Sequence, residues 1–145
     1  MTRAIEARGV YASYGDQPVL DALSFGVDKG ECFIVIGPNG SGKTTLMKLA
    51  TGIHRPDAGE IFIGGNPIRG YGRKALARKM AFVPQQVPLD FPFRVRDVVL
   101  FGRSPHLGTF GLESTHDRTL ADQAMEFMEV RHLADIPEQP HGGRV

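Results

Sequence analysis

The stretch GPNGSGKTTL (Gly37–Leu46) constrains this chain more than any other feature of its sequence. It fits the Walker A pattern G-x-x-x-x-G-K-[ST], in which glycines let the backbone curl until successive N–H groups face phosphate oxygens. An apolar run, Phe33–Ile36, precedes the stretch, and a helix is expected from near Lys43 to around Gly52. That helix would direct its unpaired N–H groups at the same anion. The pattern and its context therefore favour a nucleotide-binding loop over a chance glycine-rich turn.

Two side chains of this loop have expected roles. Lys43 should reach the β- and γ-phosphates of a nucleotide, and the Thr44 hydroxyl should complete the coordination of Mg²⁺. The loop alone does not choose among GTPases, kinases, helicases and transport ATPases. The residues predicted to contact the nucleotide from this loop are Gly37, Pro38, Asn39, Gly40, Ser41, Gly42, Lys43, Thr44 and Thr45.

The composition is that of a globular chain of 145 residues, long enough for one domain with a core. Lysine and arginine together number 17 and the acidic residues 16, so the charge balance gives no sign of a nucleic-acid partner. The single Cys32 excludes an internal disulfide and fits a reducing, intracellular setting. No apolar run approaches the roughly 20 residues of a membrane helix, so membrane association would come through a partner.

Hydrophobic periodicity predicts a mixture of strands and helices. Leu23, Phe25 and Val27 alternate with polar or small residues, as in a half-buried strand. The continuous apolar run Phe33–Ile36 suits a strand covered on both faces. Further expected elements are a turn at Arg55–Glu60 followed by a short strand, a helical segment at Arg73–Met80, and a short strand at Ala81–Val83 closed by Pro84.

The C-terminal part is predicted to be mostly helical. Ser114, with Asp117 three residues later, forms a capping-box signal for a helix N-terminus. An apolar stripe at helical spacing follows and predicts a face turned toward the core. That stripe is formed by Leu120, Ala124, Phe127 and Met128.

Over nearly all its length the chain resembles the nucleotide-binding subunits of ABC transporters. SYG (Ser13–Gly15) matches the family's aromatic A-loop, which implies that Tyr14 stacks on the adenine of ATP; the alternative is an exposed tyrosine at a strand end. AFVPQ (Ala81–Gln85) resembles the Q-loop, which implies that Gln85 touches Mg²⁺ or the attacking water and that this loop communicates with a membrane subunit. By this resemblance Lys43 and Gln85 are the catalytic residues, and the cofactors are ATP and Mg²⁺.

The segment FPFRVRDVVLFGRSPHLG (Phe91–Gly108) is similar to the start of the helical subdomain in importers of metal chelates, namely ferric siderophores, haem and cobalamin. Arg103 and His106 stand at family-typical positions in it. For His106, beside Pro105, a surface or turn-stabilising role is favoured over proton transfer or metal binding.

Part of the family's hydrolytic machinery is not found in the sequence. The Walker B strand would be four apolar residues followed by Asp and Glu, but VVLF (Val98–Phe101) is followed by Gly102. Gly142–Gly143 could be a remnant of the LSGGQ signature, yet Pro140 and His141 stand where Leu and Ser are expected. A disordered tail is the favoured interpretation, and we expect the chain to be truncated before an intact signature and Walker B.

The resemblance implies an α/β fold, the N-terminal part of a P-loop NTPase domain of ABC type with an antiparallel β-subdomain and part of the helical subdomain. We expect 1–145 to form a single incomplete domain, with the β-subdomain and phosphate-loop core in about 1–84 and the Q-loop and helical subdomain in about 85–145. In the family, C-terminal strands flank the phosphate-loop strand. Without them Phe33–Ile36 would have an open edge, so we expect a marginally stable or self-associating chain.

The implied function is that of an ATP-binding subunit of an ABC importer, which couples ATP binding and hydrolysis to uptake of an iron chelate, haem or cobalamin. The implied partners are permease subunits and a second nucleotide-binding subunit that dimerises on ATP binding, at the cytoplasmic face of the membrane. Three alternatives stay open: a nucleotide-binding module without turnover, a non-functional fragment, and a different P-loop enzyme such as a small kinase. The transported substrate is not indicated.

Overall fold

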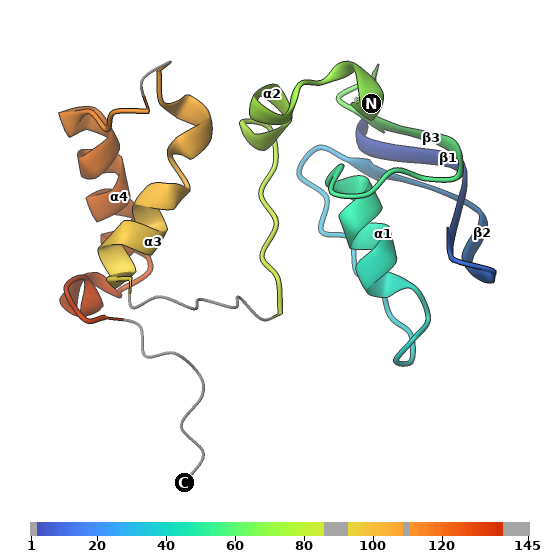
Figure 1. The fold of residues 1–145 in the computed structure, drawn as a ribbon, viewed down its shortest axis with the longest axis horizontal. Coiled ribbons are helices and arrows are strands. Elements are labelled where there is room, and N and C mark those ends of the chain that lie inside the picture. The colour runs from blue at the N-terminus through green and yellow to red at the C-terminus, as the bar shows by residue number, and fades with distance from the viewer. Residues whose placement is uncertain (1–2, 86–92, 109–110, 138–145) are drawn as a thin grey trace, which may run out of the picture. The chain divides into compact units, whose positions relative to one another are not determined.

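A computed structural model describes residues 3–85, 93–108 and 111–137. The chain divides into two units, Met1–Phe82 and Val83–Val145 (Figure 1). In the described part of the chain, no helix has the length and apolar character needed to cross a membrane.

The first unit is built on a four-stranded antiparallel sheet in the order β2-β1-β3-β4 (Figure 1). Helix α1 lies against this sheet and contributes Leu49 to its core. The alternation predicted around Phe25 is confirmed, since it falls within β2. The bounds of the elements are β1 Arg3–Tyr14, β2 Gln17–Asp28, α1 Lys43–Ala50, β3 Ala58–Ile63, β4 Asn66–Pro67 and α2 Arg73–Ala77.

The core of the first unit is apolar and lies between the sheet and α1. Strands β1 and β3 approach closely at Gly59, where a Cβ would stand 2.2 Å from the Gly9 carbonyl oxygen. Gly59 has φ +82°, so glycine is required there both for backbone conformation and for space. The buried cluster consists of Ala7, Val10, Ala12, Leu49, Ile61, Ile63 and Ile68.

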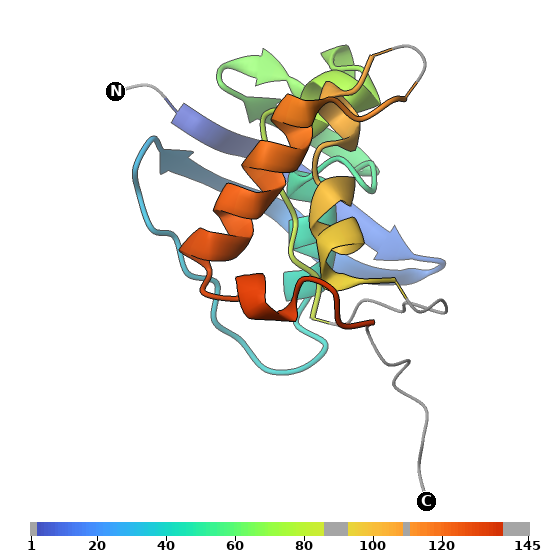
Figure 2. The same cartoon turned by 90° about the vertical axis from the view of Figure 1, so that its left-hand side faces the viewer.

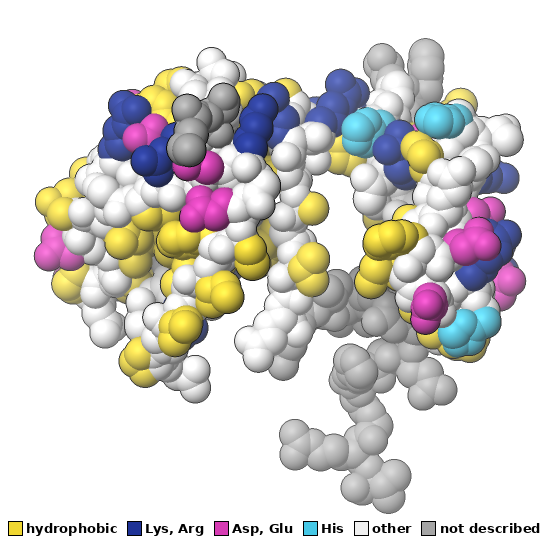
Figure 3. All heavy atoms as spheres, turned by 180° about the vertical axis from the view of Figure 1, so that it is seen from behind, with side chains coloured by type: hydrophobic (Ala, Val, Ile, Leu, Met, Phe, Trp, Pro, Cys, Tyr) yellow, Lys and Arg dark blue, Asp and Glu magenta, His cyan; other side chains and the backbone are white. Residues whose placement is uncertain are grey.

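Two predicted strands are wrong. Phe33–Ile36 and Ala81–Val83 are not strands, and Ile36 is 90% exposed. A strand exists only when its backbone N–H and C=O groups pair with a neighbour, and no described segment pairs with either run. The apolar run predicts a strand covered on both faces, and this prediction is also wrong. The exposure of Phe33–Ile36 agrees instead with the incomplete cover expected without the flanking C-terminal strands. Figure 3 shows hydrophobic side chains on the surface of the first unit.

The second unit is helical, with α3 (Val95–Phe101) and α4 (Thr115–Phe127) side by side (Figure 1 and Figure 2). The predicted capping box is confirmed: the Asp117 N–H donates to Ser114 Oγ at 3.2 Å, and the Ser114 N–H donates to Asp117 Oδ2 at 3.0 Å. Arg103, just after α3, donates from Nε to Asp117 Oδ1 at 2.9 Å. The start of α4 is thereby tied to the end of α3.

The predicted core-facing stripe of α4 is wrong. Its residue Phe127 is 86% exposed, whereas the buried residues of the helix are Asp117, Ala121 and Met125. These three are four residues apart and therefore share one face. The ion pair with Arg103 draws Asp117 inward, which turns this face toward α3 and leaves Phe127 outside. A prediction based only on the spacing of apolar residues places an aspartate on the exposed face of a helix, so it could not anticipate that Asp117 is buried.

The ionic contact of Asp117 predicts a pH dependence of stability. Hydrogen bonds from Ser114 and then from Arg103 hold the pKa of the Asp117 carboxyl well below its usual range. A lowered folded-state pKa stabilises the fold above the unfolded pKa of about 3.9, and this stabilisation is lost as pH falls below that value. We expect Asp117→Asn to lower the thermal midpoint at pH 7 and to flatten its decline between about pH 4 and pH 2. Calorimetry at several pH values measures both, and parallel pH profiles for the two proteins would contradict it.

The exposed apolar run predicts self-association of the chain. Ile36→Asp should reduce apolar-dye fluorescence and the sedimentation weight, because it places a charge in an exposed apolar patch. Its free energy of unfolding should change by only about 0.5 kcal/mol. The contrasting variant Ile61→Ala, in the buried core, should cost about 2–5 kcal/mol. A wild-type monomer that unfolds cooperatively and binds no dye would contradict this expectation.

Candidate nucleotide-binding site

The predicted phosphate loop is a sharp backbone turn that leads directly into α1. Gly40 and Gly42 have φ of +83° and +84°, in the left-handed region that favours glycine. Gly42 is the N-cap of α1, and a Cβ there would stand 3.0 Å from side-chain atoms of Val19 and Leu20 on β2. Glycine is therefore needed at Gly42 for its conformation and for the close approach to β2.

The N-terminus of α1 presents unpaired hydrogen-bond donors. No side chain caps the helix, and its first turn holds no acidic residue. The Leu46 N–H donates to the Gly42 carbonyl at 2.8 Å, so the N–H groups of residues 43–45 precede the helical ladder. The helix dipole adds positive potential at the same end. Donors and potential together suit an anion with several acceptor oxygens.

The Lys43 ammonium lies over the same loop. Its Nζ donates to the carbonyls of Gly37 and Pro38 at 2.7 Å and 2.6 Å, and lies 3.4 Å from Ser41 Oγ. A Cβ at Gly37 would stand 2.6 Å from that hydroxyl, so a side chain there would require Ser41 to change its rotamer. The cation is held by neutral carbonyls, whereas phosphate oxygens would offer it charged acceptors and stronger bonds.

The threonines that follow differ in accessibility. Thr44 is exposed and Thr45 is buried, so Thr44 is the one whose hydroxyl can meet a ligand. Among the described residues, no group of three or more His, Cys, Asp or Glu side chains could hold a metal ion. Mg²⁺ commonly keeps its waters and binds through few protein oxygens plus substrate phosphates, so a lone hydroxyl fits an ion that arrives with a nucleotide.

Tyr14 stands at the end of β1, where it pairs with Gln17 across the turn Gly15–Asp16. Its side chain is 55% exposed and can accept a ligand. Val19, two residues beyond Gln17, lies against the Gly42 position. The fold therefore brings the hairpin that carries Tyr14 close to the phosphate loop.

The other predicted residues lie in the second unit. Gln85 is exposed, and its contact with Mg²⁺ or water stays a prediction. Arg103 binds Asp117 and so supports the helical unit. His106 is exposed and ends a 3-10 turn, which agrees with the surface position favoured for it. The possible signature remnant Gly142–Gly143, with Pro140 and His141, lies outside the described residues.

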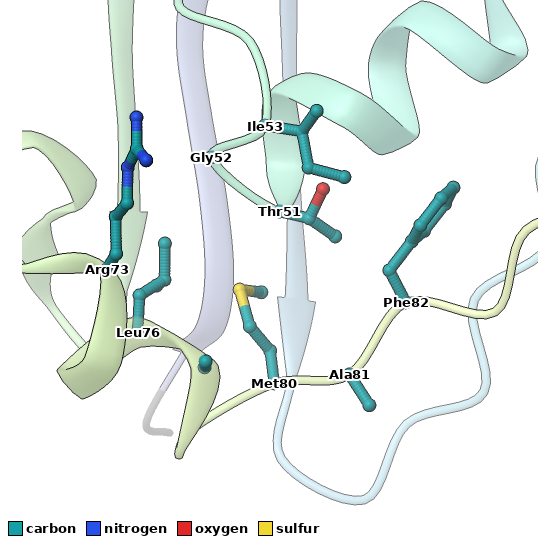
Figure 4. A pocket seen from close by; sticks show the side chains of 9 residues that line it. Thr51, Gly52, Ile53, Arg73, Leu76, Met80, Ala81 and Phe82 are labelled. Carbon is teal, nitrogen blue, oxygen red and sulfur yellow. The ribbon is translucent and has the colours of Figure 1, made fainter. Parts of the chain in front are cut away.

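A cavity of about 340 Å³ lies at the other end of α1 (Figure 4). It begins at Thr51, just after the helix, whereas the phosphate loop lies where the helix starts. Its lining is mainly apolar, with Arg73 as its charged side chain, so it lacks the converging donors of the loop. The lining residues are Thr51, Gly52, Ile53, Arg73, Leu76, Ala77, Met80, Ala81 and Phe82.

The sequence of the chain matches known proteins over most of its length. Residues 20–142 match the ABC transporter family. The chain is 43% identical over 133 residues to the Nod factor export ATP-binding protein I of Paraburkholderia xenovorans strain LB400, covering 91% of this chain and 42% of that protein. It is 40% identical over 133 residues to the hemin import ATP-binding protein of Thermobifida fusca strain YX, covering 92% and 46%. The chain thus spans less than half the length of these two curated relatives.

Solved structures of ABC transporters share the fold of this chain. An inward-facing ABC transporter described as of metal-chelate type has a TM-score of 0.74 and 35% identity, covering 93% of this chain and 48% of that chain. A nucleotide-free ATP-binding cassette from an ABC transporter also has a TM-score of 0.74, at 24% identity, covering 92% and 56%; this likeness shows the fold alone. The α/β fold is therefore part of a P-loop NTPase domain of ABC type. On its sequence match and its fold, the chain belongs to the family of ABC transporter ATP-binding subunits.

Proposed function

We propose that this chain binds Mg-ATP at the loop Gly37–Thr45 and serves as the phosphate-gripping part of an ABC transporter's ATP-binding subunit. The observation that carries the proposal is the convergence of an uncapped helix N-terminus and the Lys43 ammonium on one loop. Binding would exchange the carbonyls of Gly37 and Pro38 for phosphate oxygens as the partners of Lys43. The Thr44 hydroxyl and Gln85 are the proposed ligands of Mg²⁺, with Gln85 alternatively contacting the attacking water.

The chain's own residues bind the phosphates and orient them. Phosphoryl transfer depends mostly on positioning and on charge stabilisation, and Lys43 with the α1 N–H groups provides both for the phosphates. Mg²⁺, when bound with the nucleotide, would neutralise charge on the phosphate oxygens. The sequence offers no Asp-Glu pair after an apolar strand to act as general base, so we propose binding without turnover by this chain alone.

The transporter is proposed to import a metal chelate, namely an iron chelate, haem or cobalamin. Support comes from the 35% identical metal-chelate type structure and from the hemin import relative. Export is the second candidate, because the Nod factor export relative is 43% identical. In either case the proposed partners are permease subunits and a second ATP-binding subunit, with the chain on the cytoplasmic face of the membrane.

Removal of the lysine tests the proposed site. Lys43→Ala should weaken Mg-ATP binding by roughly tenfold to a hundredfold, because charge-assisted hydrogen bonds contribute about 1.5–3 kcal/mol. Lys48→Ala removes the same charge from the last turn of the same helix and should leave the affinity unchanged. Titration calorimetry measures binding, and steady-state phosphate release measures turnover.

Two outcomes of that experiment would contradict the proposal. Equal ATP affinity in wild type and Lys43→Ala would exclude the loop as the site. Turnover by the wild type that Lys43→Ala abolishes would show that the chain holds a complete catalytic set.

A further inference from the structure

Beyond the pair of Tyr14 with Gln17 at the turn, the end of β1 that carries Tyr14 has few ladder bonds. On the β2 side Ser13 pairs with Pro18, which has no N–H to donate, and the register shifts just before this pair. On the β3 side the ladder ends at the pair of Tyr11 with Ala58. The last residues of β1 therefore need another fixed partner if the Tyr14 ring is to keep one position.

Asp57 supplies that partner from the loop before β3. Its N–H donates to the Tyr11 carbonyl at 2.9 Å, and its Oδ2 accepts from Ser13 Oγ at 2.6 Å. This length lies within the range of hydroxyl-to-carboxylate hydrogen bonds, and the bond is exposed to solvent. In the described part of the chain, it is the side-chain bond that ties β1 to the Asp57 loop beyond the last ladder pair.

Asp57 is itself firmly placed. Pro56, whose φ is fixed by its ring, precedes it and is buried. Two residues later Gly59 lies against the Gly9 carbonyl, at a distance that leaves no room for a side chain. The backbone is thus constrained on both sides of Asp57, directly before β3 begins, and the carboxylate can in turn constrain Ser13.

We propose that Asp57, acting through Ser13, is a positioning residue that holds Tyr14 beside the phosphate loop for stacking on the base of the nucleotide. This inference rests on the proposed function. Without the hydrogen bond between Ser13 and Asp57, the end of the hairpin would become ordered only when the nucleotide binds. The free-energy cost of that ordering would lower the affinity for the nucleotide. Binding of the phosphates does not depend on the bond between Ser13 and Asp57, because the hydrogen-bond donors to the phosphates lie in the loop and in α1.

The test compares a ligand that has a base with one that has none. Dissociation constants are measured for Mg-ATP and for magnesium tripolyphosphate on the full chain. Ser13→Ala should weaken ATP binding about threefold to tenfold, which is the range expected for one hydrogen bond. It should leave the dissociation constant for tripolyphosphate unchanged. Ser13→Thr keeps the hydroxyl and should therefore bind ATP with the affinity of the wild type. Tyr14→Ala should weaken ATP by about tenfold or more, as loss of base stacking does.

Ser24→Ala is the matched control. Its hydroxyl accepts from the Gly9 N–H at 2.8 Å in the same sheet, away from the Tyr14 end. This variant should leave the ratio of the two dissociation constants at the wild-type value. Ser13→Ala combined with Asp57→Ala should bind ATP no more weakly than Asp57→Ala alone, because both remove one bond.

The possible failures are distinguishable. A wild type that binds neither ligand refutes the proposed function. A wild type that binds ATP and depends on Tyr14, with Ser13→Ala unchanged, refutes the positioning role alone. Equal losses for ATP and tripolyphosphate in Ser13→Ala also refute it, since they indicate a structural role. Circular dichroism checks each fold, and if Asp57→Ala does not fold, the pair Ser13→Ala and Ser13→Thr decides.

Discussion

The packing of Leu49 against the antiparallel sheet determines how the first unit presents its site. Leu49 is 1% exposed and belongs to the same buried cluster as Val10 and Ile61. Helix α1 has eight residues, too few to be stable without tertiary contacts, and burying this leucine contributes roughly 1.5–3 kcal/mol. The anchored helix places Gly42 against Val19 at its other end. The phosphate loop and the hairpin that carries Tyr14 are neighbours for that reason.

The parts of the fold and of the site that were predictable from sequence are local ones. The loop around Lys43, the start of α1 and the capping box at Ser114 each depend on residues within one turn, and the structure confirms all three elements. The apolar run Phe33–Ile36 predicts a covered strand, because short apolar runs usually form one. A strand forms only when another segment pairs with it, and the apolar run alone cannot show whether such a segment lies beside it.

Two other features escaped sequence reasoning because they join distant residues through polar contacts. The orientation of α4 follows from the pairing of Arg103 with Asp117, which a hydrophobic pattern does not register. The bond from Ser13 to Asp57 spans 44 residues, and its only sequence signal was a turn, in which aspartate is common for local reasons. Polar contacts of this kind orient the elements that hydrophobic patterns can only locate.

Amide hydrogen exchange with and without Mg-ATP tests the central claim most directly, namely that the loop beginning at Gly37 grips the phosphates. The account predicts slower exchange for the N–H groups of residues 39–46, with a smaller effect in the hairpin at 13–17. The cavity segments at 51–53 and 73–82 should not change. Protection confined to those cavity segments, or no protection in the loop at a saturating nucleotide concentration, would contradict it.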